Sequence, residues 1–472
     1  MTLVLLMADG ARPDTLGAAI DAGHLPAIAR LRAGGSSHVV TTVFPSVTGP
    51  AYLPFLTGRH PGDAGIPGIR WWDRSGRVVR TPGRARSYVG IDAMRADRDL
   101  DPAHATLFER TDRALAALSP FNRGLTAAQR LDGSLGFWLR LAWHHFRGDL
   151  PGWLRLERTF ATRFTERVRR DRPEVAFLAL PGIDKCSHPL GHAHPAVLDA
   201  MRVVDETVGR LTADAERDGR ADALEIWIIS DHGHAPVDHH DDLADALREL
   251  GLGVRAHPWL LAGGDDVAVM VGGNGMAHLY CDLGRRDRPW WGALAPRWEA
   301  TVTALLARPA VDLIALPLDP TRCEVRARGR GRAEVTRTAD GRYRYTPLTG
   351  DPLGLAPTLG DGGRALDADE AHEATIASAY PDALVQLATL AGSARAGDLL
   401  ISASPRWDLR ARYEPTPHRS SHGALHREHM LVPLLLSRPA IGTPRRTVDV
   451  YPSALRRLGR DLPDGLPGHA FR

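Results

Sequence analysis

The chain has 472 residues, 43% of them hydrophobic, a length that suits roughly two or three domains or one large α/β domain that carries an insertion. Its net charge is only +3, with acidic and basic residues interspersed, so it carries no nucleic-acid-binding signature. The well-separated Cys186, Cys281 and Cys323 form neither a disulfide framework nor a zinc-type pair. No stretch approaches the ~20 apolar residues of a membrane span, and the first residues read as a strand, so we expect a cytoplasmic protein.

Three short apolar runs have the length of buried strands, and each is followed closely by an aspartate. They are Thr2–Ala8 with Asp9, Glu174–Leu180 with Asp184, and Glu225–Ser230 with Asp231. Helical patterns separate them, most clearly at Ala196–Ala215, and a further run at Met430–Ser437 is expected in the same sheet. The alternation predicts an α/β fold with a doubly wound, mostly parallel sheet and helices on both faces. Ligands of such sheets bind at the carboxyl ends of the strands, where all three aspartates would lie.

Two regions depart from this alternation, and we expect them to be insertions over the carboxyl edge of the sheet. The first, about 75–173, is mostly helical in pattern and rich in Arg, Trp and His. The second, about 251–400, contains a hairpin pattern with a turn at Ala339-Asp340-Gly341.

Histidines accompany the aspartates in the sequence. His232 directly follows Asp231, His188 follows Asp184, and His422 precedes the last apolar run. Carboxylates and imidazoles together are typical ligands of zinc and also suit manganese. Taken singly, a strand-end aspartate can equally cap a helix, and a histidine is more often structural. Five further histidines are interpreted as ordinary: His239, His240, His418, His426 and His429.

Several stretches occur in a fixed order along almost the whole chain: MADGARPD, FPSVTGPAYLPFLTGRHPGDAGIPG, LPGIDKCSHPLGHAHP, SDHGH and SSHGALHREHMLVPLLL. Together they resemble the alkaline phosphatase superfamily, most closely its type I phosphodiesterase / nucleotide pyrophosphatase branch. The resemblance implies one alkaline-phosphatase-like catalytic domain over residues 1–472, a small phosphate ester or diester as substrate, and two divalent ions about 4 Å apart. The ions would be zinc, with manganese as the alternative. Carried over by position, the ligands are Asp9, Asp231, His232 and Thr48 for one ion, and Asp184, His188 and His422 for the other.

Thr48, immediately before Gly49 and Pro50, has two interpretations. Threonine is a good N-cap and proline suits the first turn, so Thr48 could simply begin a helix. The resemblance instead implies a nucleophile, activated by a metal ion, that forms a phosphothreonine intermediate. The N–H groups of Gly49 and Ala51 would then be the nearest donors to the phosphoryl oxygens.

The chain departs from the family pattern where an asparagine usually binds a phosphoryl oxygen. Here the Gly65-Ile66 pair is followed by Pro67, without an asparagine, which weighs against a nucleotide substrate. Lys185, the only lysine, is one candidate replacement, and the alternative is an ordinary solvated loop residue.

The resemblance implies, as the leading interpretation, a metal-dependent phosphodiesterase / nucleotide pyrophosphatase, and other functions remain as alternatives. A phosphomonoesterase or phosphonate hydrolase would share the metals and the nucleophile, and only the cap would distinguish it. The stretch Gly136–Leu156 mixes Trp, Phe and Leu with Arg and His, as in helices that lie on lipid. A membrane-surface or partner-binding protein is therefore an alternative of a different class. A helix packed on the domain is the favoured interpretation. A catalytically inactive relative is disfavoured because every expected metal position is filled. The oligomeric state is not predicted.

Overall fold

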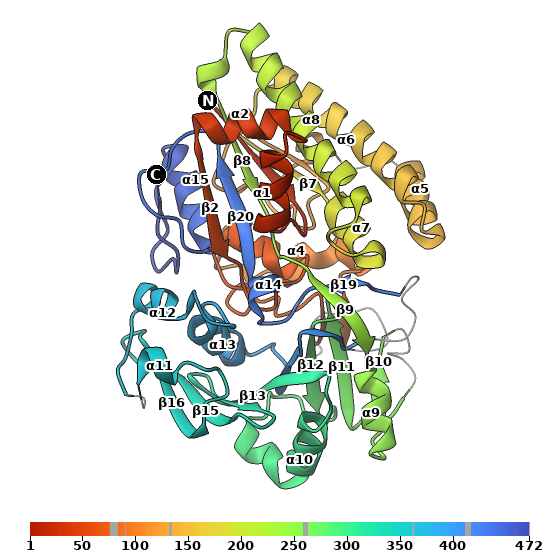
Figure 1. Cartoon of the computed structure of the whole chain (residues 1–472), viewed down its shortest axis with the longest axis vertical. Coiled ribbons are helices and arrows are strands. Elements are labelled where there is room, and N and C mark those ends of the chain that lie inside the picture. The colour runs from red at the N-terminus through yellow and green to blue at the C-terminus, as the bar shows by residue number, and fades with distance from the viewer. Residues whose placement is uncertain are drawn as a thin grey trace.

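Two sheets organise the molecule, one toward each end of its long axis (Figure 1). The computed structural model describes residues 1–75, 84–89, 91–131, 135–257, 263–360, 363–410 and 417–471. Within these residues, no helix is long and apolar enough to cross a membrane.

The first sheet has seven strands and contains the predicted apolar runs. In spatial order they are β2 (Ser36–Thr41), β20 (Leu431–Leu436), β8 (Leu224–Ile229), β1 (Thr2–Ala8), β7 (Val175–Leu180), β5 (Ala114–Ala117) and β6 (Arg130–Leu131). Strands β8, β1, β7, β5 and β6 are parallel, whereas β20 is antiparallel to both β8 and β2. Every residue of β1 is buried, because the strand is central and covered on both faces. The predicted mostly parallel α/β sheet is confirmed.

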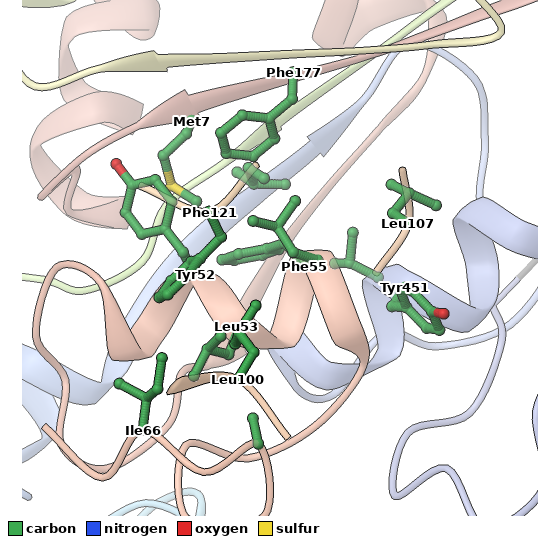
Figure 2. Packing of buried hydrophobic residues seen from close by; sticks show 14 of the residues in the cluster. Met7, Tyr52, Leu53, Phe55, Ile66, Leu100, Leu107, Phe121, Phe177 and Tyr451 are labelled. Carbon is green, nitrogen blue, oxygen red and sulfur yellow. The ribbon is translucent and has the colours of Figure 1, made fainter. Parts of the chain in front are cut away.

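Alternate residues of β1 enter two different cores. Leu3, Leu5 and Met7 pack on one face together with α3 (Leu53–Thr57) and α15 (Val450–Arg457). Figure 2 shows this packing, with Met7 and Phe177 of the strands above the aromatic side chains of the helical layer. The even-numbered residues of β1 face the other side. There the sheet packs against α1 (Pro13–Asp21), α2 (Pro26–Gly34), α6 (Leu150–Asp171) and α8 (Pro195–Arg217).

The second sheet has eight strands and occupies most of the region expected as a cap. In spatial order they are β10 (Val254–Ala256), β11 (Val267–Gly272), β12 (Met276–Cys281), β17 (Leu399–Ala403), β13 (Val311–Asp319), β14 (Arg322–Ala327), β15 (Gly331–Arg337) and β16 (Tyr343–Gly350). The hairpin found in the sequence is β15–β16, at one edge of this sheet. Helices α13 (Ala383–Gly392) and α10 (Trp291–Leu306) cover its two faces.

The region 75–173 is not simply a helical insertion. It does hold α5 (Leu135–Arg147) and α6, but it also supplies β5 and β6 of the first sheet. That expectation is corrected. The strands β5 and β6 have only four and two residues, which is too short to be recognised from their residue pattern. The remaining elements are β3 (Arg70–Trp72), β4 (Ala85–Ser87), α4 (Ala96–Asp99), α7 (Gly182–Leu190), β9 (Ala235–His240), α9 (Leu243–Glu249), α11 (Ala356–Leu359), α12 (Ala368–Thr375), β18 (Arg406–Asp408), β19 (Ser420–Ser421) and α14 (Arg427–Met430).

Candidate active site and metal centre

The three aspartates predicted from the strand pattern meet at the carboxyl edge of the first sheet. Asp9 directly follows β1, Asp231 lies two residues after the end of β8, and Asp184 lies in the first turn of α7, just after β7. Because β1 lies between β7 and β8, the ends of the three strands are neighbours. The N–H of Asp184 donates to the carbonyl of Asp9 at 3.1 Å, and the N–H of Gly10 donates to Asp231 Oδ1 at 3.1 Å.

A first group of ligand atoms forms around His232. Its Nε2 lies 3.5 Å from Asp9 Oδ1 and 3.3 Å from Asp231 Oδ2, and all three side chains are buried. The hydroxyl of Thr48 lies 3.0 Å from the same Nε2 and 3.4 Å from Asp9 Oδ1. The structure thus brings together the four residues that the resemblance assigned to one ion.

A second group forms around Asp184, where one carboxylate oxygen faces several imidazoles. Asp184 Oδ1 lies 3.2 Å from Nε2 of His188 and 3.6 Å from Nε2 of His422. The same oxygen lies 2.9 Å from Nε2 of His234, a residue that the sequence reasoning did not single out. Its only signal was its place in SDHGH, two residues after His232.

The second sheet helps to hold His422. The tip of the β11–β12 hairpin packs on the His422 backbone, which donates to the carbonyl of Gly273 at 3.1 Å and accepts from the N–H of Gly275 at 2.7 Å. Gly273 has φ +57°, and a Cβ there would lie 2.6 Å from Nδ1 of His422. A side chain at Gly273 is therefore excluded by the close approach of the ring.

The Nδ1 atoms of the predicted histidine ligands all face backbone carbonyls. His188 Nδ1 lies 3.0 Å from the carbonyl of Ser420, His422 Nδ1 lies 2.9 Å from that of Ser46, and His232 Nδ1 lies 3.1 Å from that of Gly233. A carbonyl only accepts hydrogen bonds, so Nδ1 carries the proton and the Nε2 of a neutral ring offers its lone pair. This arrangement is typical of metal-binding histidines, whose other nitrogen is fixed by an acceptor.

The electrostatics also suit cations. Burial and the neighbouring Asp231 and Asp184 raise the pKa of Asp9 well above its usual range. Burial lowers the pKa of His234 to about 3 and that of His422 well below its ordinary value, so both rings are neutral near pH 7. Asp231 Oδ2 is buried and has no hydrogen-bond partner among the residues that the structure describes. Clustered carboxylate oxygens and imidazole lone pairs fit two divalent ions chemically.

Thr48 does not cap a helix, so that interpretation is wrong. The short 3-10 helix Pro50–Tyr52 begins after Gly49, which has φ +92°, and no side-chain cap is formed. Of the two proposed backbone donors, Ala51 is already used, because its N–H donates to the carbonyl of Val47 at 3.0 Å. Gly49 stays a prediction, supported by the open space on the side where its Cβ would be.

Lys185 extends toward the helical layer. Its Nζ contacts Nδ1 of His145 in α5 and lies 5.4 Å from the centre of the Trp153 ring in α6. The residue lies on α7 and is half-buried, so it is not a solvated loop residue as the alternative had it. These contacts link α7 to α5 and α6 and give no support to a role in phosphoryl binding.

Helix α5 is the element behind the membrane-surface alternative. Phe137 packs on Phe160 of α6, with ring centres 4.8 Å apart, as expected for a helix packed on the domain. Four large apolar residues of α5 are nevertheless exposed: Trp138, Leu139, Trp143 and Phe146. Binding to a lipid surface stays a prediction.

Two further residues next to the site were not recognised from the sequence. Tyr52 donates from its hydroxyl to Asp9 Oδ2 at 2.8 Å. His418, interpreted as ordinary, places its ring 4.2 Å from that of His188, and Asn274 Nδ2 lies 2.8 Å from its Nδ1. The position of Tyr52, four residues after Thr48, was the only indication in the sequence that it could lie next to the site. No such indication existed for His418.

Comparison with known proteins agrees with this architecture. The family model described as type I phosphodiesterase / nucleotide pyrophosphatase matches residues 3–289. Phosphonoacetate hydrolase from Sinorhizobium meliloti, solved with phosphonoacetate and with phosphonoformate, is 18% identical with a TM-score of 0.56, over 97% of this chain and 95% of that one. Murine ectonucleotide pyrophosphatase / phosphodiesterase 5, solved as an inactive threonine-to-alanine variant with AMP, is 14% identical with a TM-score of 0.60, over 100% and 97%.

The human ectonucleotide pyrophosphatase / phosphodiesterase 5 is similar in fold as well, with 13% identity and a TM-score of 0.58 over 98% of this chain and 96% of that one. Among curated proteins, no sequence matches the chain. At these identities the solved structures show a shared fold, whereas the family model covers more than half of the chain. The chain therefore belongs to the type I phosphodiesterase / nucleotide pyrophosphatase family, and it is a hydrolase of phosphoric esters.

Proposed function

We propose that the protein is a two-metal-dependent phosphodiesterase that acts on a small phosphate diester through a phosphothreonine intermediate on Thr48. The position of the Thr48 hydroxyl carries this proposal. It lies 3.0 Å from His232 Nε2 and 3.4 Å from Asp9 Oδ1, within the cluster of ligand atoms and beside the open space at Gly49. An alcohol becomes a useful nucleophile when its proton has an acceptor and its oxygen lies beside positive charge.

Two steps account for the chemistry. When bound, divalent ions would supply Lewis-acid stabilisation of the oxygen atoms around phosphorus. Thr48 Oγ1 gives its proton to solvent and forms a bond to phosphorus while the bond to one ester oxygen breaks. The departing alkoxide takes up a proton from solvent, so no net proton is gained or lost. A water molecule then attacks the phosphothreonine, returns a proton to Oγ1 and releases a phosphate monoester.

The side chains around Thr48 hold it for the in-line attack. Asp9 is fixed from the other side by the Tyr52 hydroxyl, and His232 is fixed by the carbonyl at its Nδ1. The family's usual asparagine is missing, and the Gly49 N–H is the donor that we propose for a phosphoryl oxygen. Removing a single donor of this kind typically costs a factor of about 100–1,000 in rate.

The metal that we propose is zinc, with manganese as the alternative. The ligands combine carboxylates with imidazoles, and imidazole nitrogen favours zinc over manganese. The substrate is less constrained. Phosphonoacetate and AMP are bound by proteins of similar fold, so a phosphonate hydrolase or a phosphomonoesterase on the same site is the second candidate.

The test is hydrolysis of bis-p-nitrophenyl phosphate, p-nitrophenyl phosphate and phosphonoacetate by metal-stripped protein refilled with zinc or manganese. We expect the diester to be cleaved much faster than the other two. Thr48→Ala should lose about a thousandfold or more in kcat with little change in metal content, and Thr48→Ser should retain part of the activity. Preference for the monoester or the phosphonate would replace the diesterase proposal, and full activity of Thr48→Ala would exclude the nucleophile.

A further inference from the structure

His234 lies at the junction of β8 and β9 and takes no part in the ligand sets implied by the family resemblance. We infer that His234 is a direct ligand of the second metal ion, beside Asp184, His188 and His422. This inference rests on the proposed two-metal function and changes the chemistry of its second site. With three imidazoles and one carboxylate, that site is built to select zinc over manganese.

The first argument is the arrangement of the rings. The ring centres of His188, His234 and His422 are 5.0, 5.1 and 5.3 Å apart, so they form a nearly equilateral triangle. Their Nε2 atoms lie 3.2, 2.9 and 3.6 Å from a single oxygen, Oδ1 of Asp184. The ligand atoms of Asp184, His188 and His234 all lie within 4.8 Å of one another, close enough to share one ion.

The second argument is the position of the protons on the ring of His234. Its Nδ1 lies 3.2 Å from Oγ of Ser420, and this hydroxyl donates to the carbonyl of Ala235 at 3.0 Å. Since a serine hydroxyl has one proton, Oγ is left to accept from Nδ1–H. The Nε2 of the neutral ring therefore turns its lone pair toward a carboxylate oxygen 2.9 Å away. Two lone pairs at that distance repel each other unless a cation lies between them.

A buried histidine elsewhere in the chain shows what a structural role looks like. His278 is as deeply buried as His234, and burial likewise lowers its pKa to about 3. Its Nδ1 accepts from the N–H of Gly397 at 3.1 Å, and its Nε2 faces the carbonyl of Pro67 at 3.0 Å. Both nitrogens of His278 are satisfied by the backbone, whereas Nε2 of His234 is not.

The third argument is that the backbone leaves room for the ring. Gly10 has φ +74°, and a Cβ at this position would lie 2.9 Å from Nε2 of His234 and 3.0 Å from Cβ of Asp184. The glycine directly after Asp9 is thus what lets His234 and Asp184 approach each other at the edge of the sheet.

The test is metal binding by the full chain, with activity left aside. Apo protein is titrated with Zn²⁺ in competition with a chromophoric chelator for the wild type, His234→Gln, His234→Cys and His278→Gln. The glutamine keeps an N–H that can donate to Asp184 but is a poor zinc ligand, the cysteine restores a ligand, and His278→Gln controls for the loss of a buried imidazole. Circular dichroism of each apo protein reports folding.

We expect His234→Gln to weaken the binding of one of two zinc ions by about a hundredfold or more, since even residues that only support a ligand contribute factors of about 10–100. His234→Cys should recover most of that loss, and His278→Gln should change neither ion. X-ray absorption at the zinc edge can be measured on the wild type alone. It should show four imidazole ligands in total, shared between the two ions. Three imidazoles, or undiminished zinc binding by folded His234→Gln, would overturn the inference and leave His234 as a hydrogen-bond donor to Asp184. A wild type that binds two zinc ions in this way but cleaves no ester would contradict the proposed function alone.

Discussion

The hydroxyl of Tyr52 donates a 2.8 Å hydrogen bond to Oδ2 of Asp9, the carboxylate whose other oxygen lies 3.4 Å from the Thr48 hydroxyl. Tyr52 and Thr48 are four residues apart, so one turn of chain carries both the proposed nucleophile and the group that orients its neighbour. Tyr52→Phe should therefore free Asp9 to rotate. We expect metal affinity at the first site to fall about tenfold and kcat to fall with it, measured by zinc titration and diester hydrolysis.

Tyr451 provides the matched control for this change. It is a buried tyrosine of the same hydrophobic core (Figure 2), and its hydroxyl donates to the carbonyl of Ala105 at 2.9 Å. Tyr451→Phe removes a hydrogen bond of similar length from a place outside the site. Equal losses of metal affinity in both variants would mean that the effect of Tyr52→Phe is general destabilisation.

Gly273→Ala should disturb the second ion from outside the ligand set. The new Cβ would lie 2.6 Å from Nδ1 of His422, and alanine tolerates the φ of +57° poorly. We expect a stability loss of about 1 kcal/mol or more together with weaker binding of one zinc ion. Gly284→Ala, where a Cβ meets nothing within 4 Å, serves as the control and should leave zinc binding unchanged.

Removal of the metal ions should lower the thermal stability of the protein. Without cations, the carboxylates of Asp9, Asp184 and Asp231 repel one another at the buried edge of the sheet, or one of them must take up a proton. An ion present at a hundred times its Kd stabilises the fold by about 2.7 kcal/mol. For 472 residues, with an unfolding entropy of about 2.1 cal/mol/K per residue, this corresponds to a Tm increase of about 3 °C for each ion. Differential scanning calorimetry with zinc and with a chelator measures the shift, and identical Tm values would contradict a metal-binding native state.

Glu157 should make the stability depend on pH. Burial raises its pKa from 4.5 to about 8, although the N–H of Gly182 donates to Oε1 at 3.0 Å. Between these pH values the folded protein holds a proton that the unfolded chain has released, so the free energy of unfolding falls as the pH rises, by up to about 5 kcal/mol.

Glu157→Gln keeps an acceptor for the Gly182 N–H and removes the ionisation. Denaturant titrations at pH 5.5 and pH 8.5 should therefore show a smaller difference for Glu157→Gln than for the wild type, with the variant more stable at the higher pH. The same pH dependence in both proteins would assign it to other groups.

The sequence by itself predicted the first sheet and most residues of the candidate metal centre. Apolar runs such as Thr2–Ala8 are buried on both faces, so their composition is local evidence of a central parallel strand, and the residue after each run must lie at the ligand-binding edge. The positions of Asp9, Asp184 and Asp231 after three such runs were enough to predict that they lie together. Strands β5 and β6 escaped recognition because they have only four and two residues, too few to show a strand pattern.

Only the tertiary structure decided which atoms face one another. His234 and His278 are both buried histidines. Asp184 lies opposite Nε2 of His234, whereas the carbonyl of Pro67 lies opposite that of His278. Lys185 follows a predicted ligand, yet its side chain extends to α5 and α6 because the helix turns it away. Sequence spacing determines which residues share an element, whereas hydrogen-bond partners far apart in the chain determine the protonation and direction of each side chain, and with them its chemistry.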